Sequence, residues 1–378
     1  MKKKQHILFL CGWYPSRVLP ENGDFIERHA TAVALQHTVT VIHCITDARL
    51  TERTAIVSET NNGVTTHIAY VRPTKNPALK MYWFFKALLQ CLEKVGTFDM
   101  VHLHELYPFG LFALYLKRRF KVPYIITEHW TGYHQPQAEQ LPFFQKIISR
   151  RITKSAAFVC PVSFHLQQAM QELKFEGNYQ CVPNVVDTSL FVPGVKSKEL
   201  TTFVHISSMN DAHKNISGIL RVVANLQKER SDFTMKFIGV HATKFLKLAT
   251  TLGISPKHCQ FIDHIPQKEL VRELQTAHAL VLFSNYENLP CVVLEAFSCG
   301  VPVISTNVGG INEYFPAHFG TLIKAKDEDA LLQEMKKTPC NALDYSTEMH
   351  RYAETHFSPE RIAEEYTNLY EKALKNSL

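Results

Sequence analysis

The sequence lacks the patterns that would place the protein in a membrane or make it depend on disulfides. None of its apolar runs approaches the length of a transmembrane helix. Its nine cysteines are an odd number, are scattered, and include no Cys-x-x-Cys pair, which argues against a disulfide framework and a zinc knuckle. The basic residues 2–4 precede an apolar run that is too short for a signal peptide. We therefore expect a cytoplasmic protein in a reducing compartment.

The composition is that of a globular protein whose positive charge lies in its first half. Charged residues make up 20% and hydrophobic residues 46% of 378 positions, which is enough for two domains with their own cores. Up to Asp187 the chain carries 21 Lys and Arg against 14 Asp and Glu, and the remainder carries 20 against 21. We expect the basic half to meet an anionic partner or an anionic membrane surface, with a solvated basic face as the alternative. No nucleic acid partner is expected.

Short apolar runs alternate with helical patterns along the chain, which predicts parallel sheets wrapped by helices. We expect a first domain at 1–188, a second at 189–358, and a last helix at 359–378 that packs back onto the first. The fold class is therefore α/β, with two Rossmann-like domains. The expected strands of the two domains are 6–11, 39–44, 67–71, 100–103, 124–127, 158–161, 179–182, 202–206, 233–238, 260–262, 279–283 and 301–305.

The stretch 284–313 reads as loop, helix, strand and loop after the buried strand at 279–283. Pro290 suits the first position of a helix, and Gly300 suits its end. Glu287 lies in the loop and Glu295 in the helix, so two carboxylates flank backbone N–H groups that favour an anion. Carboxylates accept hydrogen bonds from sugar hydroxyls, so this arrangement suits a sugar nucleotide. The alternative is a buried strand–helix–strand unit with two solvated glutamates.

Polar residues also follow predicted strands in the first half. His104 and Glu105 end one strand and His129 follows the next, which we interpret as the lining of a cleft, with His129 as the best candidate. The His-x-His pair ending in His104 has no further ligand at a recognisable spacing, so no metal is expected. Asn22-Gly23 predicts a turn that can face a phosphate, with a plain turn and helix cap as the alternative. Asp24 is expected to cap the next helix in a capping box with Glu27.

Two amphipathic helices are expected at 80–94 and 141–154, and residues 117–121 hold four charges in five positions. Together these segments could form a membrane-surface face. Alternatively, their aromatic side chains pack on the sheet and form core.

Four segments resemble glycosyltransferase family 4. The Glu287-x7-Glu295 block resembles that family's donor-site signature. Residues 183–187, Pro-Asn-Val-Val-Asp, resemble its Pro-Asn-Gly-Val-Asp segment at the domain junction. Residues 127–129 resemble the segment that bears the active-site histidine, and residues 213–215 resemble the loop that bears the phosphate-binding lysine.

The resemblance implies a GT-B fold, with two facing Rossmann-like domains and an active site in the cleft between them. It implies retaining transfer from a nucleotide-diphosphate sugar, a UDP- or GDP-sugar, with no tightly bound cofactor and no obligatory metal. The implied catalytic residues are His129, Glu287 and Lys214. The implied donor-binding residues are Gly23, Lys214, Asn288, Leu289, Pro290 and Glu295, and residues of weaker support are Ser208, His213, His104, Glu105, Gly309 and Gly310.

One departure from the family pattern concerns the phosphate site. The family places an arginine a few residues before the lysine, whereas Ser208 stands there in this chain. This loses a bidentate phosphate partner, for which His213 is a candidate substitute.

The expected function is transfer of a sugar to a glycan or lipid-linked acceptor in bacterial-type surface polysaccharide synthesis, by a cytoplasmic enzyme peripheral to the membrane. The alternatives are a sugar-nucleotide epimerase, a glycoside phosphorylase, a non-catalytic sugar-nucleotide-binding relative, and a two-lobed solute-binding protein.

Overall fold

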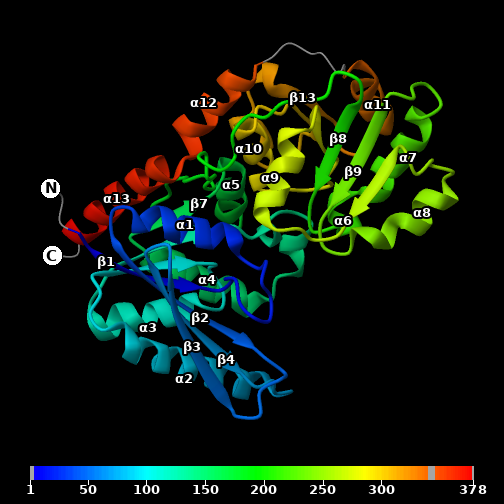
Figure 1. Cartoon of the computed structure of the whole chain (residues 1–378). Coiled ribbons are helices and arrows are strands. Elements are labelled where there is room, and N and C mark those ends of the chain that lie inside the picture. Colours follow the sequence, from blue (N-terminus) through cyan, green and yellow to red (C-terminus); the bar gives the residue numbers. More distant parts are fainter. Residues whose placement is uncertain (1–3, 339–344, 377–378) are drawn as a thin grey trace. The chain divides into compact units, whose positions relative to one another are not determined.

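The computed structural model describes residues 4–338 and 345–376 and divides the chain into two compact units. The first unit comprises Met1–Val185 together with Pro359–Leu378, and the second comprises Val186–Ser358. The described part of the last helix, α13, therefore belongs to the first unit although it follows the second in sequence (Figure 1).

A seven-stranded sheet forms the centre of the first unit, in the order β3-β4-β2-β1-β5-β6-β7. Every neighbouring pair is parallel except β3 and β4, which form an antiparallel hairpin at one edge. The strands are β1 His6–Cys11, β2 Thr38–Thr46, β3 Thr54–Asn61, β4 Val64–Val71, β5 Met100–His104, β6 Tyr124–Glu128 and β7 Phe158–Pro161.

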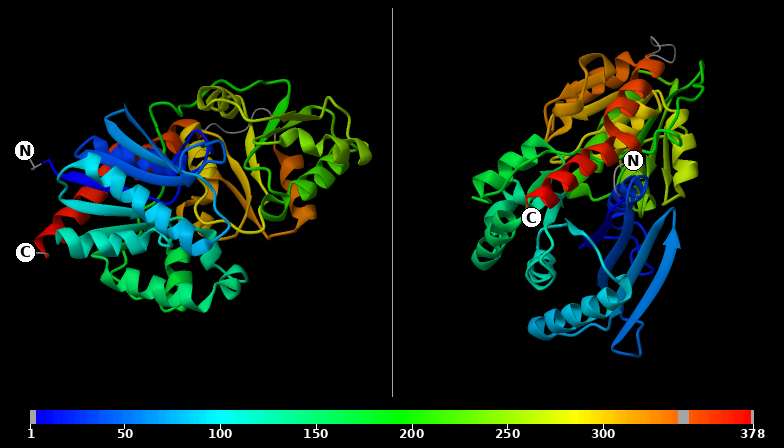
Figure 2. Two further views of the ribbon diagram at one scale, coloured as in Figure 1. Left: turned by 90° about the horizontal axis from the view of Figure 1, so that it is seen from below. Right: turned by 90° about the vertical axis from the view of Figure 1, so that its left-hand side faces the viewer.

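Helices cover both faces of this sheet (Figure 2). Alternate residues of β1 (Ile7, Phe9 and Cys11) pack in one core with α1 and α13, because successive strand residues point to opposite faces. Helix α2 packs on β2 and β4, where Gln90 accepts a hydrogen bond from Thr54 of β3. The helices of this unit are α1 Asp24–Ala34, α2 Pro77–Val95, α3 Gly110–Phe120, α4 Phe143–Ser155, α5 Phe164–Glu172 and α13 Pro359–Lys375.

The second unit holds a wholly parallel six-stranded sheet in the order β10-β9-β8-β11-β12-β13. Its strands are β8 Thr201–Ile206, β9 Phe233–Ile238, β10 Cys259–Ile262, β11 Ala279–Leu282, β12 Val303–Thr306 and β13 Gly320–Ile323. Its helices are α6 Asp211–Lys214, α7 Ile216–Leu226, α8 Leu246–Thr251, α9 Gln267–Gln275, α10 Cys291–Ser298, α11 Glu328–Lys337 and α12 Ser346–Phe357. Both units thus alternate strands with helices, as predicted.

Three local predictions were wrong. Residues 179–182 form no strand, and only Tyr179 makes an isolated bridge to Val159. Asp24 does not cap α1: the N-cap is Gly23 in the left-handed region, and no side chain bonds there, so no capping box forms. Pro290 is the N-cap of α10 and not its first helical residue. Strands β3 and β13 were not predicted.

Candidate active site

Three neighbouring strands of the second unit direct their following loops to one edge of the sheet. Strands β8, β11 and β12 are adjacent and parallel, so their carboxyl ends lie together. The loop after β8 leads to His213 and Lys214, the loop after β11 carries Glu287, and the loop after β12 carries Gly309. Ligands of open parallel sheets bind at such an edge.

Glu287 and Lys214 form a buried ion pair at this edge. Lys214 Nζ lies 2.5 Å from Glu287 Oε1, and the two side chains are 11% and 5% exposed. Ser284 donates a second hydrogen bond to the same oxygen at 2.7 Å. His213 Nε2 lies 3.6 Å from Glu287 Oε2, and its ring stacks on Tyr286 with centroids 4.3 Å apart. The carboxylate is therefore fixed from three sides.

Glu287 is ionised in this setting. Burial by itself would raise the pKa of the carboxyl, but the positive charge of Lys214 and the proximity of His213 outweigh it. The net result is a pKa lowered to about 2. A fixed, ionised carboxylate is a strong acceptor for the hydroxyl groups of a ligand.

The loop after β12 packs directly on the Glu287 loop. Gly309 has φ +62°, and a Cβ atom there would lie 1.9 Å from the carbonyl oxygen of Glu287. Gly310 donates its backbone N–H to the carbonyl of Asn288 at 2.9 Å. The hydroxyl of Thr306 donates to the carbonyl of Ser284 at 2.7 Å. Gly309, which has no side chain to clash, thus lets the two loops meet backbone to backbone and hold Glu287 in place.

Helix α10 begins within the same loop. Asn288 and Leu289 are buried, Pro290 is the N-cap, and Glu295 is buried inside the helix. Backbone N–H groups at a helix start carry partial positive charge. Glu295 is therefore not one of the solvated glutamates that the simpler interpretation of this stretch required, and neither is Glu287.

The predicted phosphate loop differs in detail from the expectation. Lys214 ends the short helix α6, and Asn215 caps the next helix through its side chain. Ser208 is exposed at the carboxyl end of β8, beside the buried Met209 with φ +56°. His213 and Lys214 both lie beside Glu287.

In the first unit, the predicted histidines also gather at a carboxyl edge. His104 ends β5 and His129 follows β6, and Nδ1 of His104 lies 3.4 Å from Nε2 of His129. His29 of α1 packs against both rings, with centroids 5.8 Å and 5.4 Å away. Burial lowers the pKa of all three histidines, so they are neutral near pH 7.

A second layer of hydrogen bonds lies beneath these rings. His102 bonds Tyr370 of α13 at 2.7 Å and Thr127 of β6 at 2.7 Å. Thr127 also bonds Tyr366 of α13 at 2.9 Å. Helix α13 therefore supports the strand ends that carry His104 and His129.

Two carboxyls lie at the same edge, the buried Glu128 and the partly buried Glu105. Glu128 accepts backbone N–H bonds from Leu106, His129 and Trp130 at 2.8–2.9 Å. Glu105 has φ +73° and lies so close to Gly12 that a Cβ there would be 1.8 Å from its Oε2. Burial, with the nearby charge of Glu128, raises the pKa of Glu105 to about 9, so this carboxyl is protonated at pH 7.

Gly23 closes the loop between β1 and α1. Its φ is +80°, and a Cβ atom there would lie 2.7 Å from the backbone carbon of Trp13. A larger residue would push the loop away from the strand end, so this position requires glycine for steric reasons.

The structure brings the predicted residues together within each unit. His213, Lys214, Glu287 and the Gly309–Gly310 loop meet in the second, and His104, Glu105 and His129 meet in the first. In residues 4–338 and 345–376 no group of three or more His, Cys, Asp and Glu side chains has the arrangement of a metal site.

Sequence reasoning missed Ser284, His29 and Glu128. Ser284 stands three positions before Glu287 in the same loop, which is a usable signal. Glu128 immediately precedes His129 and was passed over because a lone glutamate in a strand has no distinctive spacing. Nothing in the helical pattern of α1 distinguished His29.

Comparison with known proteins gives a consistent picture. The family profile described as Glycosyltransferase Family 4 matches residues 26–190, and that described as Glycosyl transferases group 1 matches residues 190–355. TuaC of Bacillus subtilis, named for teichuronic acid biosynthesis, is 23% identical over 309 residues, which cover 77% of this chain and 75% of TuaC. D-inositol 3-phosphate glycosyltransferase of Corynebacterium jeikeium is 24% identical over 317 residues, covering 75% and 74%.

Solved structures share the fold. Sucrose-phosphate synthase of Thermosynechococcus elongatus superposes with a TM-score of 0.79 at 16% identity, covering 99% of this chain and 100% of that one. HepE of Anabaena, in complex with UDP and glucose, superposes with a TM-score of 0.72 at 14% identity, covering 97% and 99%. The predicted GT-B fold is confirmed. The two adjoining family profiles, the shared fold and the relatives agree, and this chain belongs to the family 4 glycosyltransferases.

Proposed function

We propose that this glycosyltransferase takes a sugar from a nucleoside-diphosphate sugar and transfers it, with retention of the anomeric configuration, to a glycan or lipid-linked acceptor. The observation that carries the proposal is the buried contact of Lys214, His213 and Glu287 beside the start of α10. It combines an anionic acceptor for sugar hydroxyls with cationic and N–H donors for phosphate oxygens.

A departing nucleoside diphosphate develops negative charge, and preorganised donors in a water-poor site stabilise such charge. In our proposal Lys214 shifts from Glu287 to the diphosphate when the donor binds, and Glu287 then accepts from the sugar. Glu295 accepts from the ribose, while Asn288, Leu289 and Pro290 shape the entrance of α10. Ser208 supplies no charge, so Lys214, His213 and the N–H groups of α10 replace the missing arginine.

His129 and Gly23 extend the proposal to the first unit. The neutral ring of His129, supported by His104, would contact the donor sugar, and the loop closed by Gly23 would lie near the donor phosphates. The protonated Glu105 can donate a hydrogen bond in that loop region. The complex of HepE with UDP and glucose supports a nucleotide-sugar donor, and the name of TuaC supports a polysaccharide acceptor.

Donor binding is the direct test. UDP, GDP and their sugars are added one at a time, and only the ligands that carry one of the two bases should raise the melting temperature. A ligand at 100 times its Kd stabilises the folded protein by about 2.7 kcal/mol. We propose that no metal is required, so the shift should persist in EDTA. The variant Lys214→Met should lose most of this ligand-induced rise in melting temperature. If no nucleotide changes the melting temperature of the wild type, the proposed donor class is wrong.

Transfer must also be distinguished from the alternative activities. An epimerase would convert the bound sugar nucleotide without an acceptor, and a phosphorylase would need inorganic phosphate. NMR spectra of the incubated sugar nucleotide should show neither reaction. With an acceptor present, the anomeric coupling in the product reports retention directly.

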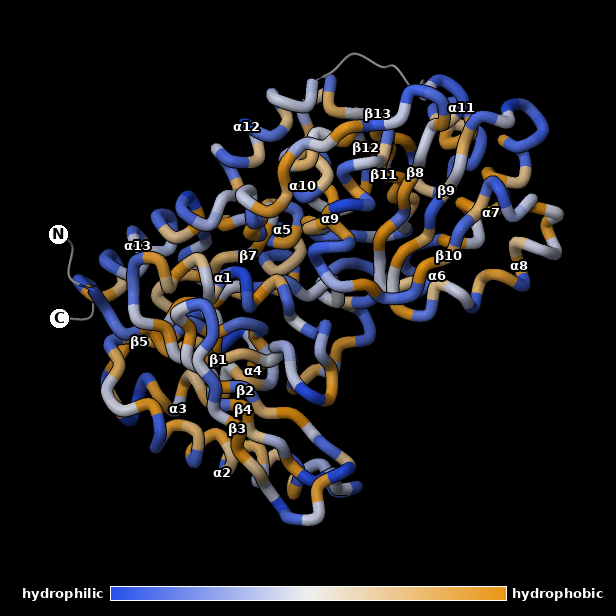
Figure 3. Tube along the Cα trace, in the orientation of Figure 1, coloured by the Kyte–Doolittle hydropathy of each residue, from blue (hydrophilic) through white to orange (hydrophobic). Residues whose placement is uncertain are grey.

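A peripheral membrane contact is the second part of the proposal. None of the described helices is long and apolar enough to cross a membrane. Large hydrophobic side chains are nevertheless exposed on α2 and α4, including Tyr82 (57%), Phe143 (75%) and Phe144 (57%). Figure 3 shows hydrophobic stretches beside hydrophilic ones along α2 and α3. We infer that these aromatic side chains are not all core.

Basic side chains accompany this exposed apolar surface. A cavity of about 450 Å³ between α3 and α4 is lined by Arg118, Arg119 and Arg151 together with Leu111 and Tyr115. Helix α2 packs against α3 through Phe85, whose ring lies 5.1 Å from that of Phe112. Apolar side chains beside arginines match the interface of an anionic membrane.

The double variant Phe143→Ser/Phe144→Ser tests the membrane contact. Each buried aromatic contributes about 1.5–3 kcal/mol, so we expect at least a tenfold loss of cosedimentation with phosphatidylserine vesicles at low salt. Leu246→Ser, an exposed leucine of the second unit, is the matched control and should bind as the wild type does. A wild type that stays in the supernatant would refute the contact.

A further inference from the structure

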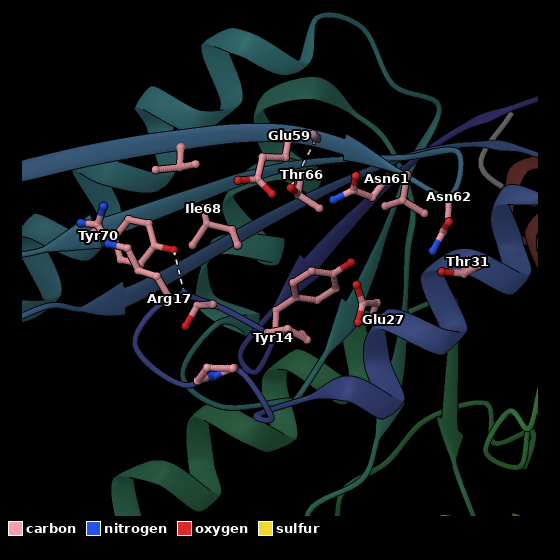
Figure 4. Close-up of a pocket in the computed structure, with 15 residues that line it drawn as sticks. Tyr14, Arg17, Glu27, Thr31, Glu59, Asn61, Asn62, Thr66, Ile68 and Tyr70 are labelled. Carbon is pink, nitrogen blue, oxygen red and sulfur yellow. Dashed lines mark hydrogen bonds between the residues drawn. The ribbon is translucent and has the colours of Figure 1, made fainter. Parts of the chain in front are cut away.

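A groove opens on the first unit beside α1, and the clustered histidines are not among the residues that line it. The hairpin of β3 and β4 extends the sheet beyond α1, so the side of the hairpin that faces α1 is not covered by that helix (Figure 4). The groove has a volume of about 460 Å³, within the range of small-molecule sites. We call it the hairpin groove.

Strand alternation determines which side chains form its floor. The cross-strand pairs Val57–Ile68, Glu59–Thr66 and Asn61–Val64 all point into the groove. The residues between them point to the other face, where Thr60 bonds Thr65 at 3.2 Å and α2 packs on β4. One face of the hairpin therefore lies on the side where α2 packs, and the other face lines the groove.

The walls come from α1 and from the loop after β1. Glu27 and Thr31 are four residues apart on α1 and so lie on one side of the helix. Tyr14, Ser16 and Arg17 come from the loop that connects β1 to Gly23. The groove thus starts at the loop of the candidate active-site edge and runs along the hairpin toward its turn.

The charges of the groove exclude a phosphate as its preferred ligand. Among the described residues that line it, Arg17 alone is cationic, and Glu27 and Glu59 are acidic. Arg17 is already engaged, because its Nε lies 3.0 Å from Asp47 and its guanidinium covers the ring of Tyr70 at 3.9 Å. An anionic ligand would meet two carboxylates and no unengaged cation, so the groove favours a neutral ligand.

The remaining side chains favour a ligand rich in hydroxyl groups. The carboxylates of Glu27 and Glu59 accept hydrogen bonds, the amide of Asn61 donates and accepts, and the hydroxyls of Thr31 and Thr66 do both. Aliphatic side chains lie between them on the floor. A pyranose presents hydroxyl groups at its rim and C–H groups on its faces, and so matches both kinds of surface.

We propose that the hairpin groove binds neutral sugar residues of the glycan acceptor, behind the end that receives the new sugar. The inference rests on the proposed transfer to a glycan. It adds a subsite that holds the chain already built and so makes the enzyme prefer longer acceptors.

Two substitutions on the same hairpin test the proposal. Thr66→Trp fills the groove, whereas Thr60→Trp makes the same kind of change on the opposite face. The probe is a microarray of neutral oligosaccharides from bacterial polysaccharides. We expect the wild type and Thr60→Trp to bind the same long oligosaccharides and Thr66→Trp to lose at least tenfold in affinity for them. The KM for the long acceptor should rise as much, with kcat unchanged, while the KM for a one-sugar acceptor stays as in the wild type.

Several results would overturn the groove assignment. They are equal binding by Thr66→Trp and wild type, binding of anionic glycans alone, or binding of none of the neutral oligosaccharides. Melting temperatures measured with and without the nucleotide show whether a variant is folded. If Thr66→Trp is misfolded, Glu59→Lys takes its place as the groove variant. If the nucleotide stabilises the protein but the groove variants behave as the wild type, only the groove inference fails. If no nucleotide stabilises the protein, the proposed function fails.

Discussion

Replacing Glu287 with glutamine is expected to slow sugar transfer about 10²–10³-fold, the range found when one preorganised charge-stabilising group is removed. The structure predicts a loss of stability as well. Glu287 is buried against Lys214, and breaking a buried pair by removing one partner costs about 3–5 kcal/mol. Urea unfolding and initial transfer rates measure the two effects separately.

The double variant Glu287→Gln/Lys214→Met separates the two roles of the pair. It leaves no unpaired buried charge, so unfolding should return toward the wild type while transfer stays low. As a control, Glu328→Gln removes the acid of the more exposed Arg221–Glu328 pair and should change stability by about 1 kcal/mol or less. Near-wild-type transfer by Glu287→Gln would show that this carboxylate has no part in the reaction.

Gly309→Ala is expected to have an effect of similar size without touching a charged group. The added methyl group would lie 1.9 Å from the carbonyl oxygen of Glu287, so the two loops must separate. Displacement of a catalytic group by about 1 Å can cost on the order of 10²-fold in rate. The left-handed backbone adds about 1–2 kcal/mol of strain. Transfer rate and melting temperature should fall together.

Gly253→Ala is the matched control for backbone strain. Gly253 also has a positive φ, +69°, but a Cβ there would meet nothing within 4 Å. It should lose about 1–2 kcal/mol of stability and keep full transfer activity. If the two glycine variants have equal activity, contact between the Gly309 loop and the Glu287 loop does not position Glu287.

Local patterns predicted most of the fold. Strands β1, β7 and β9 match the predicted ranges to the residue: β1 and β7 consist mainly of consecutive apolar residues, and β9 alternates apolar residues with Thr234 and Lys236. Strand β3 was missed because it lies at the sheet edge, is half exposed, and pairs only with β4. Strand β13 has four residues and begins at a glycine. The formation of an edge strand depends more on pairing with its neighbouring strand than on an apolar pattern in its own sequence.

The sequence identified the residues of the candidate site but not the contacts between them. Lys214 and Glu287 are 73 positions apart, and they meet because β8 and β11 are neighbours in the sheet. No short-range pattern encodes that order. The sequence placed Glu287 in a ligand loop, and the structure shows in addition that its carboxylate is buried and paired with Lys214. The assigned roles of Glu287, Lys214 and His129 stay predictions until variants are measured.

Helix α13 sets the order in which the first unit can be completed during synthesis. His102 and Tyr370 are bonded although 268 positions separate them, and the whole second unit lies between them in sequence. Until α13 leaves the ribosome, the face of β5 and β6 beneath His104 and His129 has no cover from it. The second unit, continuous from Val186 to Ser358, has no such dependence. Although synthesised later, it can finish folding first, and the histidine edge becomes complete only with the last helix.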